Sequence, residues 1–303
     1  MAARFTVLAS GSSGNASLIE LDGFGLLVDC GLGPRALASR FAAVGLSWQA
    51  VSAVVITHTH GDHWNALTLA HLRRLNIPLI AHPRHHDYLA SRPEHSALCK
   101  AGLVREYGAD RWFDLTPALG CRPVRVSHDS DPTFAFRIES REDTGSWALG
   151  LASDVGHITP ELAAAFDGVD ALAIEYNHDV QMQKQSGRAK YLIDRVLGDD
   201  GHLSNVQAAD FTRHIVKAGR ERFAFLVQLH LSRDCNKPEL AAKVGKAALA
   251  EVPSAMLVTA TQFNPTTPLP LVARPRPVRH LVRPNPPVKR SFQPTLPGID
   301  EPR

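Results

Sequence analysis

Three histidines and an aspartate stand within six residues of this chain, in the order His58-Thr59-His60-Gly61-Asp62-His63. They directly follow Val51 to Ile56, an apolar and largely β-branched run that predicts a buried strand. Imidazole and carboxylate groups this dense, where the backbone leaves a strand, are more typical of metal ligands than of core packing. A solvent-exposed histidine-rich strand end is the alternative, and it accounts less well for the regular spacing. The chain is therefore expected to fold so that this strand end forms part of a metal site.

Other predicted strands end in the same kind of residue. Apolar strands are expected over 124–126, 147–152, 171–175 and 223–229. The polar residues that follow them are His128, Asp154, Asn177, His178 and His230. Layered α/β proteins build their sites on the loops at one edge of their sheets. The recurrence therefore predicts that these strand ends meet and form a single site.

Amphipathic segments between the strands predict helices, for example over 34–44, 64–75 and 237–251. Proline near the start of the first of these segments suits the first turn of a helix. Ser204 is expected to cap a helix that begins after it. Strands that alternate with helices in this way predict an α/β protein.

Composition limits the alternatives. The chain has 303 residues, 44% hydrophobic and 21% charged, as in ordinary globular proteins. Its four cysteines, Cys30, Cys99, Cys121 and Cys235, are far apart, which argues against a disulfide framework or a thiolate metal site and favours a reducing compartment. No apolar run approaches the roughly 18 residues of a membrane span, and the first ten residues lack a signal-peptide layout. We expect a cytoplasmic protein without a membrane partner.

The C-terminal segment has a different composition. Residues 261–303 hold 11 of the 21 prolines and seven Lys/Arg against two acidic residues, a net charge of +5. Residues 1–260 then carry −2 of the total of +3, so net charge gives no reason to expect that they bind nucleic acid. We predict one folded domain over 1–260 and an extended or disordered basic tail over 261–303. The tail is either plain solvated chain, a weak tether to nucleic acid, or a docking segment for an unknown partner.

Several polar residues outside the array are ambiguous. The Ser/Gly loop over residues 10–15 is either a connector or a loop that presents backbone N–H groups to a phosphate. Asp29 either orients a metal-binding histidine or simply ends a strand. His82, His85 and His86 are expected on the surface or in a loop, because no carboxylate stands near them at ligand spacing.

The order His58-x-His60-x-Asp62-His63, then His128, Asp154 and His230, resembles the metallo-β-lactamase superfamily. Three further strings resemble its YycJ/WalJ-type single-domain nucleases, namely Ser10-Gly11-Ser12-Ser13-Gly14-Asn15, Glu175-Tyr176-Asn177-His178-Asp179 and Gly201-His202-Leu203-Ser204-Asn205. The resemblance covers about residues 4–260. It implies a four-layer αββα sandwich with a dinuclear metal site along one edge, here followed by a Pro/Arg-rich C-terminal extension.

The resemblance also implies which residues bind which metal ion. One ion would be held by His58, His60 and His128. The other would be held by Asp62, His63 and His230, and Asp154 would bridge the two. Imidazole and carboxylate ligands without thiolate suit Zn²⁺ or Mn²⁺, and seven ligands are too many for one tetrahedral ion.

Two divalent cations about 3.5–4 Å apart can hold a hydroxide between them and neutralise charge on a phosphoryl oxygen. The leading hypothesis is therefore metal-dependent phosphodiester hydrolysis, and the resemblance implies exonucleolytic cleavage of DNA. Asp154 would position the hydroxide and Asp62 would accept its proton. His178 and His202 would contact the scissile phosphate or protonate the leaving oxygen. The predicted substrate contacts are Ser12, Asn15, Asn177, Ser204 and Asn205.

Two other functions fit the same ligands. The first keeps the metals and changes the bond, giving a hydrolase of a small ester, thioester, lactone or cyclic nucleotide. Asp62 is shared by many such enzymes, so the array alone does not separate them from nucleases. The second is a non-enzymatic accessory protein of a signalling system, in which the metals are structural or vestigial. The complete ligand set argues against this second alternative.

Overall fold

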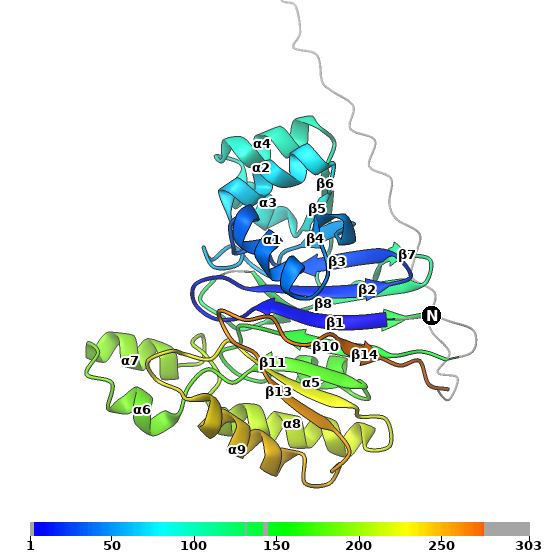
Figure 1. Cartoon of the computed structure of the whole chain (residues 1–303). Coiled ribbons are helices and arrows are strands. Elements are labelled where there is room, and N and C mark those ends of the chain that lie inside the picture. The colour runs from blue at the N-terminus through cyan, green and yellow to red at the C-terminus, as the bar shows by residue number, and fades with distance from the viewer. Residues whose placement is uncertain (1–2, 131, 142–144, 276–303) are drawn as a thin grey trace, which may run out of the picture.

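The protein is a sandwich of two sheets with helices on both outer faces. The computed structural model describes residues 3–130, 132–141 and 145–275. Figure 1 shows α1 to α4 above the first sheet and α5, α8 and α9 below the second, with α6 and α7 projecting to one side. The four-layer αββα architecture predicted from the sequence is confirmed.

The first sheet has seven strands in the order β14-β1-β2-β3-β4-β5-β6. Its strands are β1 (Ala3–Ala9), β2 (Ala16–Leu21), β3 (Phe24–Val28), β4 (Ala53–Val55), β5 (Leu79–Ala81), β6 (Val104–Glu106) and β14 (Leu269–Leu271). Strands β14 to β3 pair antiparallel, whereas β3 to β6 pair parallel. Parallel neighbours need a crossover connection, which the helices between these strands provide. These helices are α1 (Pro34–Ala43), α2 (Ala66–Leu75), α3 (Pro83–Leu89) and α4 (Pro93–Lys100).

The second sheet has the order β13-β12-β11-β10-β9-β8-β7. Its strands are β7 (Phe113–Thr116), β8 (Leu119–Val126), β9 (Thr133–Ser140), β10 (Ala148–Ala152), β11 (Ala171–Glu175), β12 (Phe225–Leu229) and β13 (Met256–Thr259). Strands β10 to β13 are parallel. Their connections carry α5 (Pro160–Phe166), α6 (Val180–Lys184), α7 (Lys190–Leu197), α8 (Asn205–Gly219) and α9 (Pro238–Ala248).

The central strands are buried on both faces, so alternate side chains enter different layers of the core. In β11, Ala171 and Ala173 pack between the two sheets, whereas Leu172 and Ile174 pack against the outer helices. This explains why the strand is a continuous apolar run in the sequence, without the alternation of a half-exposed strand. The three core layers fix the relative positions of the strand ends.

Local signals set where the helices begin. Ser204 caps α8, and its hydroxyl and the Gln207 side chain form a reciprocal capping box. The helix predicted over 64–75 begins at Ala66 because the Asn65 side chain accepts a hydrogen bond from the Thr68 amide. Within the described residues, none of the helices combines the length and apolar character needed to cross a bilayer. The predicted cytoplasmic location stays a prediction.

The chain just after residue 260 belongs to the sandwich. β14 extends the first sheet by pairing with β1, and Thr266 Oγ1 accepts a hydrogen bond of 3.0 Å from the Val7 amide. The boundary predicted at residue 260 is therefore too early, because the open edge of β1 offers hydrogen bonds that a proline-rich segment can still satisfy on one side. The remainder of the predicted tail, 276–303, lies outside the described residues.

Candidate metal centre

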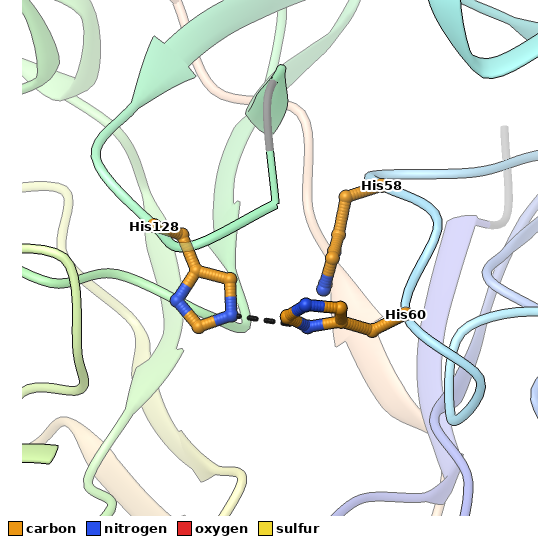
Figure 2. A group of neighbouring side chains, drawn as sticks. All are labelled: His58, His60 and His128. Carbon is orange, nitrogen blue, oxygen red and sulfur yellow. Dashed lines mark hydrogen bonds between the residues drawn. The ribbon is translucent and has the colours of Figure 1, made fainter. Parts of the chain in front are cut away.

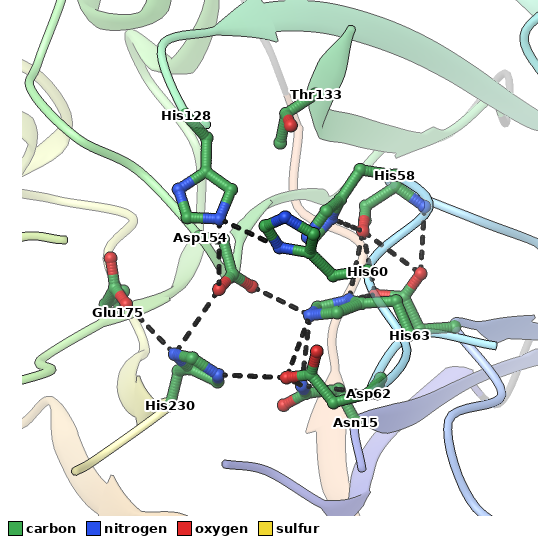
Figure 3. Close-up of polar contacts among 12 residues, drawn as sticks. Asn15, His58, His60, Asp62, His63, His128, Thr133, Asp154, Glu175 and His230 are labelled. Carbon is green, nitrogen blue, oxygen red and sulfur yellow. Dashed lines mark hydrogen bonds and ion pairs between the residues drawn. The ribbon is translucent and has the colours of Figure 1, made fainter. Parts of the chain in front are cut away.

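The seven predicted metal ligands come together at one edge of the sandwich (Figure 3). Each follows a strand whose carboxyl end lies at that edge. The loop after β4 contributes His58, His60, Asp62 and His63, and the segments after β8, β10 and β12 contribute His128, Asp154 and His230. The prediction that these strand ends meet is confirmed by their side-chain distances.

His58, His60 and His128 form the group that we call the imidazole half, shown in Figure 2. One nitrogen of each ring lies within 4.8 Å of the others, and His60 Nδ1 is 3.3 Å from His128 Nε2. The outward nitrogens are fixed, since His58 Nδ1 lies 2.9 Å from Thr57 Oγ1 and His128 Nδ1 lies 2.9 Å from the Gly201 carbonyl. His58 Nε2 is buried and has no hydrogen-bond partner in the described chain. A buried unpaired nitrogen is costly by itself, so this group fits a metal ion.

Asp62, His63 and His230 form the carboxylate half. Asp62 Oδ2 lies 3.4 Å from His230 Nε2 and 3.5 Å from His63 Nε2. Asp154 lies between the two halves, with its carboxylate oxygens 3.0 Å from His63 Nε2, 3.4 Å from His230 Nδ1 and 3.9 Å from His128 Nε2. These buried His/Asp clusters are consistent with a dinuclear metal site.

Further carboxylates hold the carboxylate half from outside. Asp29 Oδ2 lies 2.8 Å from His63 Nδ1, and Asp29 Oδ1 accepts a hydrogen bond of 2.8 Å from the Thr57 amide. Asp29 therefore orients His63, as one of the two sequence alternatives proposed. Such partners fix the tautomer of a ligating imidazole and raise its basicity.

Glu175 orients histidines on the other side of the centre. Its Oε1 lies 3.0 Å from His230 Nδ1 and 2.7 Å from His202 Nδ1. Its Oε2 accepts hydrogen bonds of 3.1 Å from the amides of Val155 and Leu203. Both oxygens are thus engaged within the protein, so Glu175 orients the two histidines. No role was predicted for Glu175 from the sequence, although its position as the last residue of β11 was the available signal.

The two halves differ in the charge of their imidazoles. Burial and the charge of nearby His63 lower the pKa of His58. Burial and nearby His128 lower the pKa of His60, so both His58 and His60 are neutral at pH 7. Burial would also lower the pKa of His63 and of His230. For His63, the nearby charges of Asp29 and Asp154 outweigh burial and raise the pKa well above normal. For His230, the charge of Asp154 does the same.

The carboxylates shift in the opposite direction. Burial would raise the pKa of Asp154, but the charges of His230 and His63 hold it well below its usual value. Burial would also raise the pKa of Asp62, but hydrogen bonds from His230 and His63 outweigh burial and lower it. Both aspartates are therefore anionic and suited to bind a cation.

His202 and His178, the two candidates for contact with the scissile phosphate, differ in environment. The ring centroid of His202 lies 5.0 Å from that of His128 and 5.3 Å from that of His230. Burial lowers the pKa of His202, but the charge and hydrogen bond of Glu175 outweigh this and raise it. His178 is 1% exposed, neither ring nitrogen has a partner in the described chain, and burial lowers its pKa to about 4.

Most of the predicted substrate contacts are engaged within the protein. Asn15 Nδ2 lies 3.1 Å from Asp62 Oδ2, and Asn177 Nδ2 donates to the His230 carbonyl. Ser204 caps α8, and the Asn205 side chain bonds to that of Asn236. Ser12 is exposed. The role of these five residues toward substrate stays a prediction.

The histidines expected on the surface are packed in and around α3. His85 and His86 are 1% and 8% exposed, and His82 caps the helix. His85 Nε2 lies 2.7 Å from the Pro132 carbonyl, and His86 Nδ1 lies 3.0 Å from His95 Nε2. The expectation was wrong for His85 and His86, because a backbone carbonyl holds His85 Nε2, and a neighbouring imidazole and a second carbonyl hold the two nitrogens of His86, without a carboxylate.

Comparison with known proteins agrees with the fold and the site. Residues 25–225 match the family model described as a beta-lactamase superfamily domain. The chain belongs to the metallo-β-lactamase superfamily and is a metal-dependent hydrolase. The resemblance seen in the sequence motifs is thereby confirmed.

Individual relatives cover most of the chain. Exodeoxyribonuclease YycJ of Bacillus anthracis is 31% identical over 257 residues, which are 80% of this chain and 87% of the relative. Exodeoxyribonuclease WalJ of Streptococcus pneumoniae is 28% identical over 247 residues, 78% of this chain and 85% of its own. The metallo-β-lactamase fold protein YhfI of Bacillus subtilis superposes with a TM-score of 0.61 and 15% identity, covering 88% of this chain and 99% of its own. This last likeness supports the fold alone.

Proposed function

We propose that this protein is an exonuclease that hydrolyses phosphodiester bonds of DNA. The observation that carries the proposal is the His202–Glu175 pair beside the metal centre, with 2.7 Å between His202 Nδ1 and Glu175 Oε1. A phosphodiester needs a proton on its leaving oxygen, and an imidazole with a raised pKa can supply one. The preference for DNA is supported by the two relatives described as exodeoxyribonucleases.

The seven ligands would hold two divalent cations, Zn²⁺ or Mn²⁺, because the donors are imidazole nitrogens and carboxylate oxygens without sulfur. When bound, such cations lower the pKa of water and neutralise charge on a phosphoryl oxygen. Asp154 would bind both, since it lies within 3.9 Å of histidines from each half. We propose Asp62 chiefly as a ligand, because a carboxylate with so low a pKa is a weak proton acceptor.

His202 would act as the general acid. Glu175 occupies its Nδ1, which leaves Nε2 as the nitrogen that can give a proton to the leaving oxygen. Asp154 lies 3.7 Å from the same Nδ1 and adds to the negative charge that keeps the ring protonated. His178 is neutral at pH 7 and buried, so we propose it for a positioning role near the phosphate rather than for proton donation.

A substrate panel tests the proposal. Purified protein loaded with Mn²⁺ or Zn²⁺ would be assayed on end-labelled duplex DNA, single-stranded DNA, RNA and a small ester. We expect shortening of DNA from an end, lost in His60→Ala and retained in the exposed-surface control Arg4→Ala. Hydrolysis of the small ester alone would contradict the proposal. A pH profile in which His202→Ala loses one ionisation that the wild type shows would support His202 as the acid.

A further inference from the structure

The Ser/Gly loop between β1 and β2 is held in one conformation. The Gly11 amide donates to Asn15 Oδ1 (2.9 Å), and the Ser13 amide donates to Gln262 Oε1 (2.8 Å). Gly11 and Gly14 have φ values of 141° and 143°, which side-chain-bearing residues rarely adopt. The loop is therefore a fixed platform whose exposed residues are Ser12 and Ser13.

The platform is attached directly to the carboxylate half. Ser10 Oγ accepts a hydrogen bond of 2.8 Å from the His230 amide, and Asn15 Nδ2 lies 3.1 Å from Asp62 Oδ2. Asn15 Nδ2 also lies 3.1 Å from His63 Nε2. A ligand group on the outer side of this loop would therefore stand next to a group held at the metal centre.

Arg233 lies on this outer side, three residues after His230. It is exposed, and its Nη2 donates a hydrogen bond of 3.1 Å to Ser13 Oγ. In the described part of the chain no carboxylate is paired with Arg233, and the adjacent Asp234 pairs with Arg188 at 2.6 Å. A guanidinium has five N–H donors in a planar fork that matches a phosphate, and most of these donors are not used here.

We infer that Arg233, oriented by Ser13, binds the phosphate of the nucleotide next to the scissile bond. This inference deepens the proposed nuclease function and rests on it for the polynucleotide substrate. A guanidinium that binds the neighbouring phosphate favours a polynucleotide, because a substrate with a single phosphodiester has no second phosphate to bind. Arg233 is thus a residue that selects the length of the substrate and takes no part in bond cleavage.

Binding measurements test this inference without cleavage. The metal-loaded protein would be titrated into a fluorescent single-stranded oligonucleotide with phosphorothioate linkages, over a range of KCl concentrations. Arg233→Ala should weaken binding roughly five- to tenfold at low salt. It should also reduce the slope of log K against log [KCl] by about 0.7, the value for one phosphate contact on a single strand. Arg233→Lys should restore most of the slope because it keeps the charge.

Arg220→Ala is the matched control. It removes the same charge at the far end of α8, where Arg220 pairs with Glu251 at 3.7 Å, and it should leave the slope unchanged. In a second measurement, Arg233→Ala should lower kcat/KM on DNA through KM while hydrolysis of bis(4-nitrophenyl) phosphate stays at the wild-type rate.

The outcomes separate this inference from the proposed function. An unchanged salt slope in Arg233→Ala, or a wild type that does not bind the oligonucleotide, overturns the role of Arg233. Equal losses on DNA and on the small diester also overturn it. A wild type that binds through Arg233 and cleaves no nucleic acid supports the phosphate contact and contradicts the nuclease.

Discussion

The two halves of the metal centre are built from similar ligands on different supports. The imidazole half borders solvent, since the His60 side chain is 34% exposed and lies 3.4 Å from Asp129, itself paired with Arg195 on α7. The carboxylate half is more enclosed, because the Asp62 side chain is 20% exposed and the His63 side chain is fully buried against Asp29. The first half is thus held partly by a surface ion pair, and the second by buried carboxylates.

This difference determines the protonation state in which each half meets a cation. His58 and His60 are neutral at pH 7 and need lose no proton, whereas His63 and His230 are protonated beside anionic carboxylates. A cation must displace the protons of the carboxylate half before it binds there. We therefore expect the imidazole half to fill first at low pH.

The largest expected effect comes from the residue that the halves share. Asp154→Ala should reduce the rate of hydrolysis by more than roughly 100-fold, because it removes a contact to both halves. Loss of a residue that only orients a metal ligand costs up to about 100-fold. Metal analysis of the purified variant should give fewer than two ions per chain. A variant that retained two ions and wild-type turnover would contradict the placement of Asp154 between the halves.

The pH dependence of metal binding should separate the halves. The pKa values of His63 and His230 are raised, so affinity at the carboxylate half falls as pH falls, by about tenfold per pH unit for each proton displaced. The pKa values of His58 and His60 are lowered, so these two ligands have almost no proton to release between about pH 8 and about pH 6.5, and affinity at the imidazole half should fall less over that range. Equilibrium dialysis against a metal buffer should show about two ions per chain at the higher pH and one at the lower. An equal fall in metal affinity at both halves would contradict the predicted difference between them.

Substitution of outer partners should affect the enclosed half more. Glu175→Gln keeps the size of the side chain and removes the charge that orients His202 and His230, so we expect a 10- to 100-fold loss of activity or of affinity for the second ion. Asp129→Asn changes a half-exposed partner of His60 and should cost less. Metal affinity from chelator competition, and kcat, would be measured for both variants. A larger loss of either in Asp129→Asn than in Glu175→Gln would contradict the prediction.

The smallest effect is expected at the surface ion pair. Arg195→Ala breaks the contact from α7 to Asp129, and because the Arg195 side chain is 55% exposed, the change should be at most about fivefold in affinity for the first ion. Raising the salt concentration should shrink the difference from wild type, since exposed pairs are screened. Chelator competition at low and high KCl provides the measurement, and a salt-independent loss would indicate a buried role for this pair.

Strand ends and ligand types were predictable because they depend on local sequence. The apolar run before His58 and the run over 171–175 form strands, and the resemblance of the motifs pointed to seven of the residues that the structure brings together. Short-range order of this kind follows from side-chain periodicity and from the chemistry of each donor. The same local reasoning placed Ser204 at the start of α8.

Three features depended on contacts between distant segments. Glu175 reaches His230 because β11 lies beside β12 in the second sheet, and it reaches His202 in the segment before α8. Residues 269–271 join the first sheet because β1 leaves an open edge, although the composition there predicts a tail. Arg233 meets Ser13 across a separation of 220 residues, and no sequence pattern relates the two.

The sequence by itself determined the superfamily, and with it the class of fold and of enzyme, because the motif residues and their order along the chain carry that resemblance. It also pointed to the seven residues that meet at the candidate metal centre. Only the tertiary structure decided how the ligands divide in charge between an imidazole half and a carboxylate half. That division arises from burial and from the carboxylates around each ring, and both depend on how the two sheets pack.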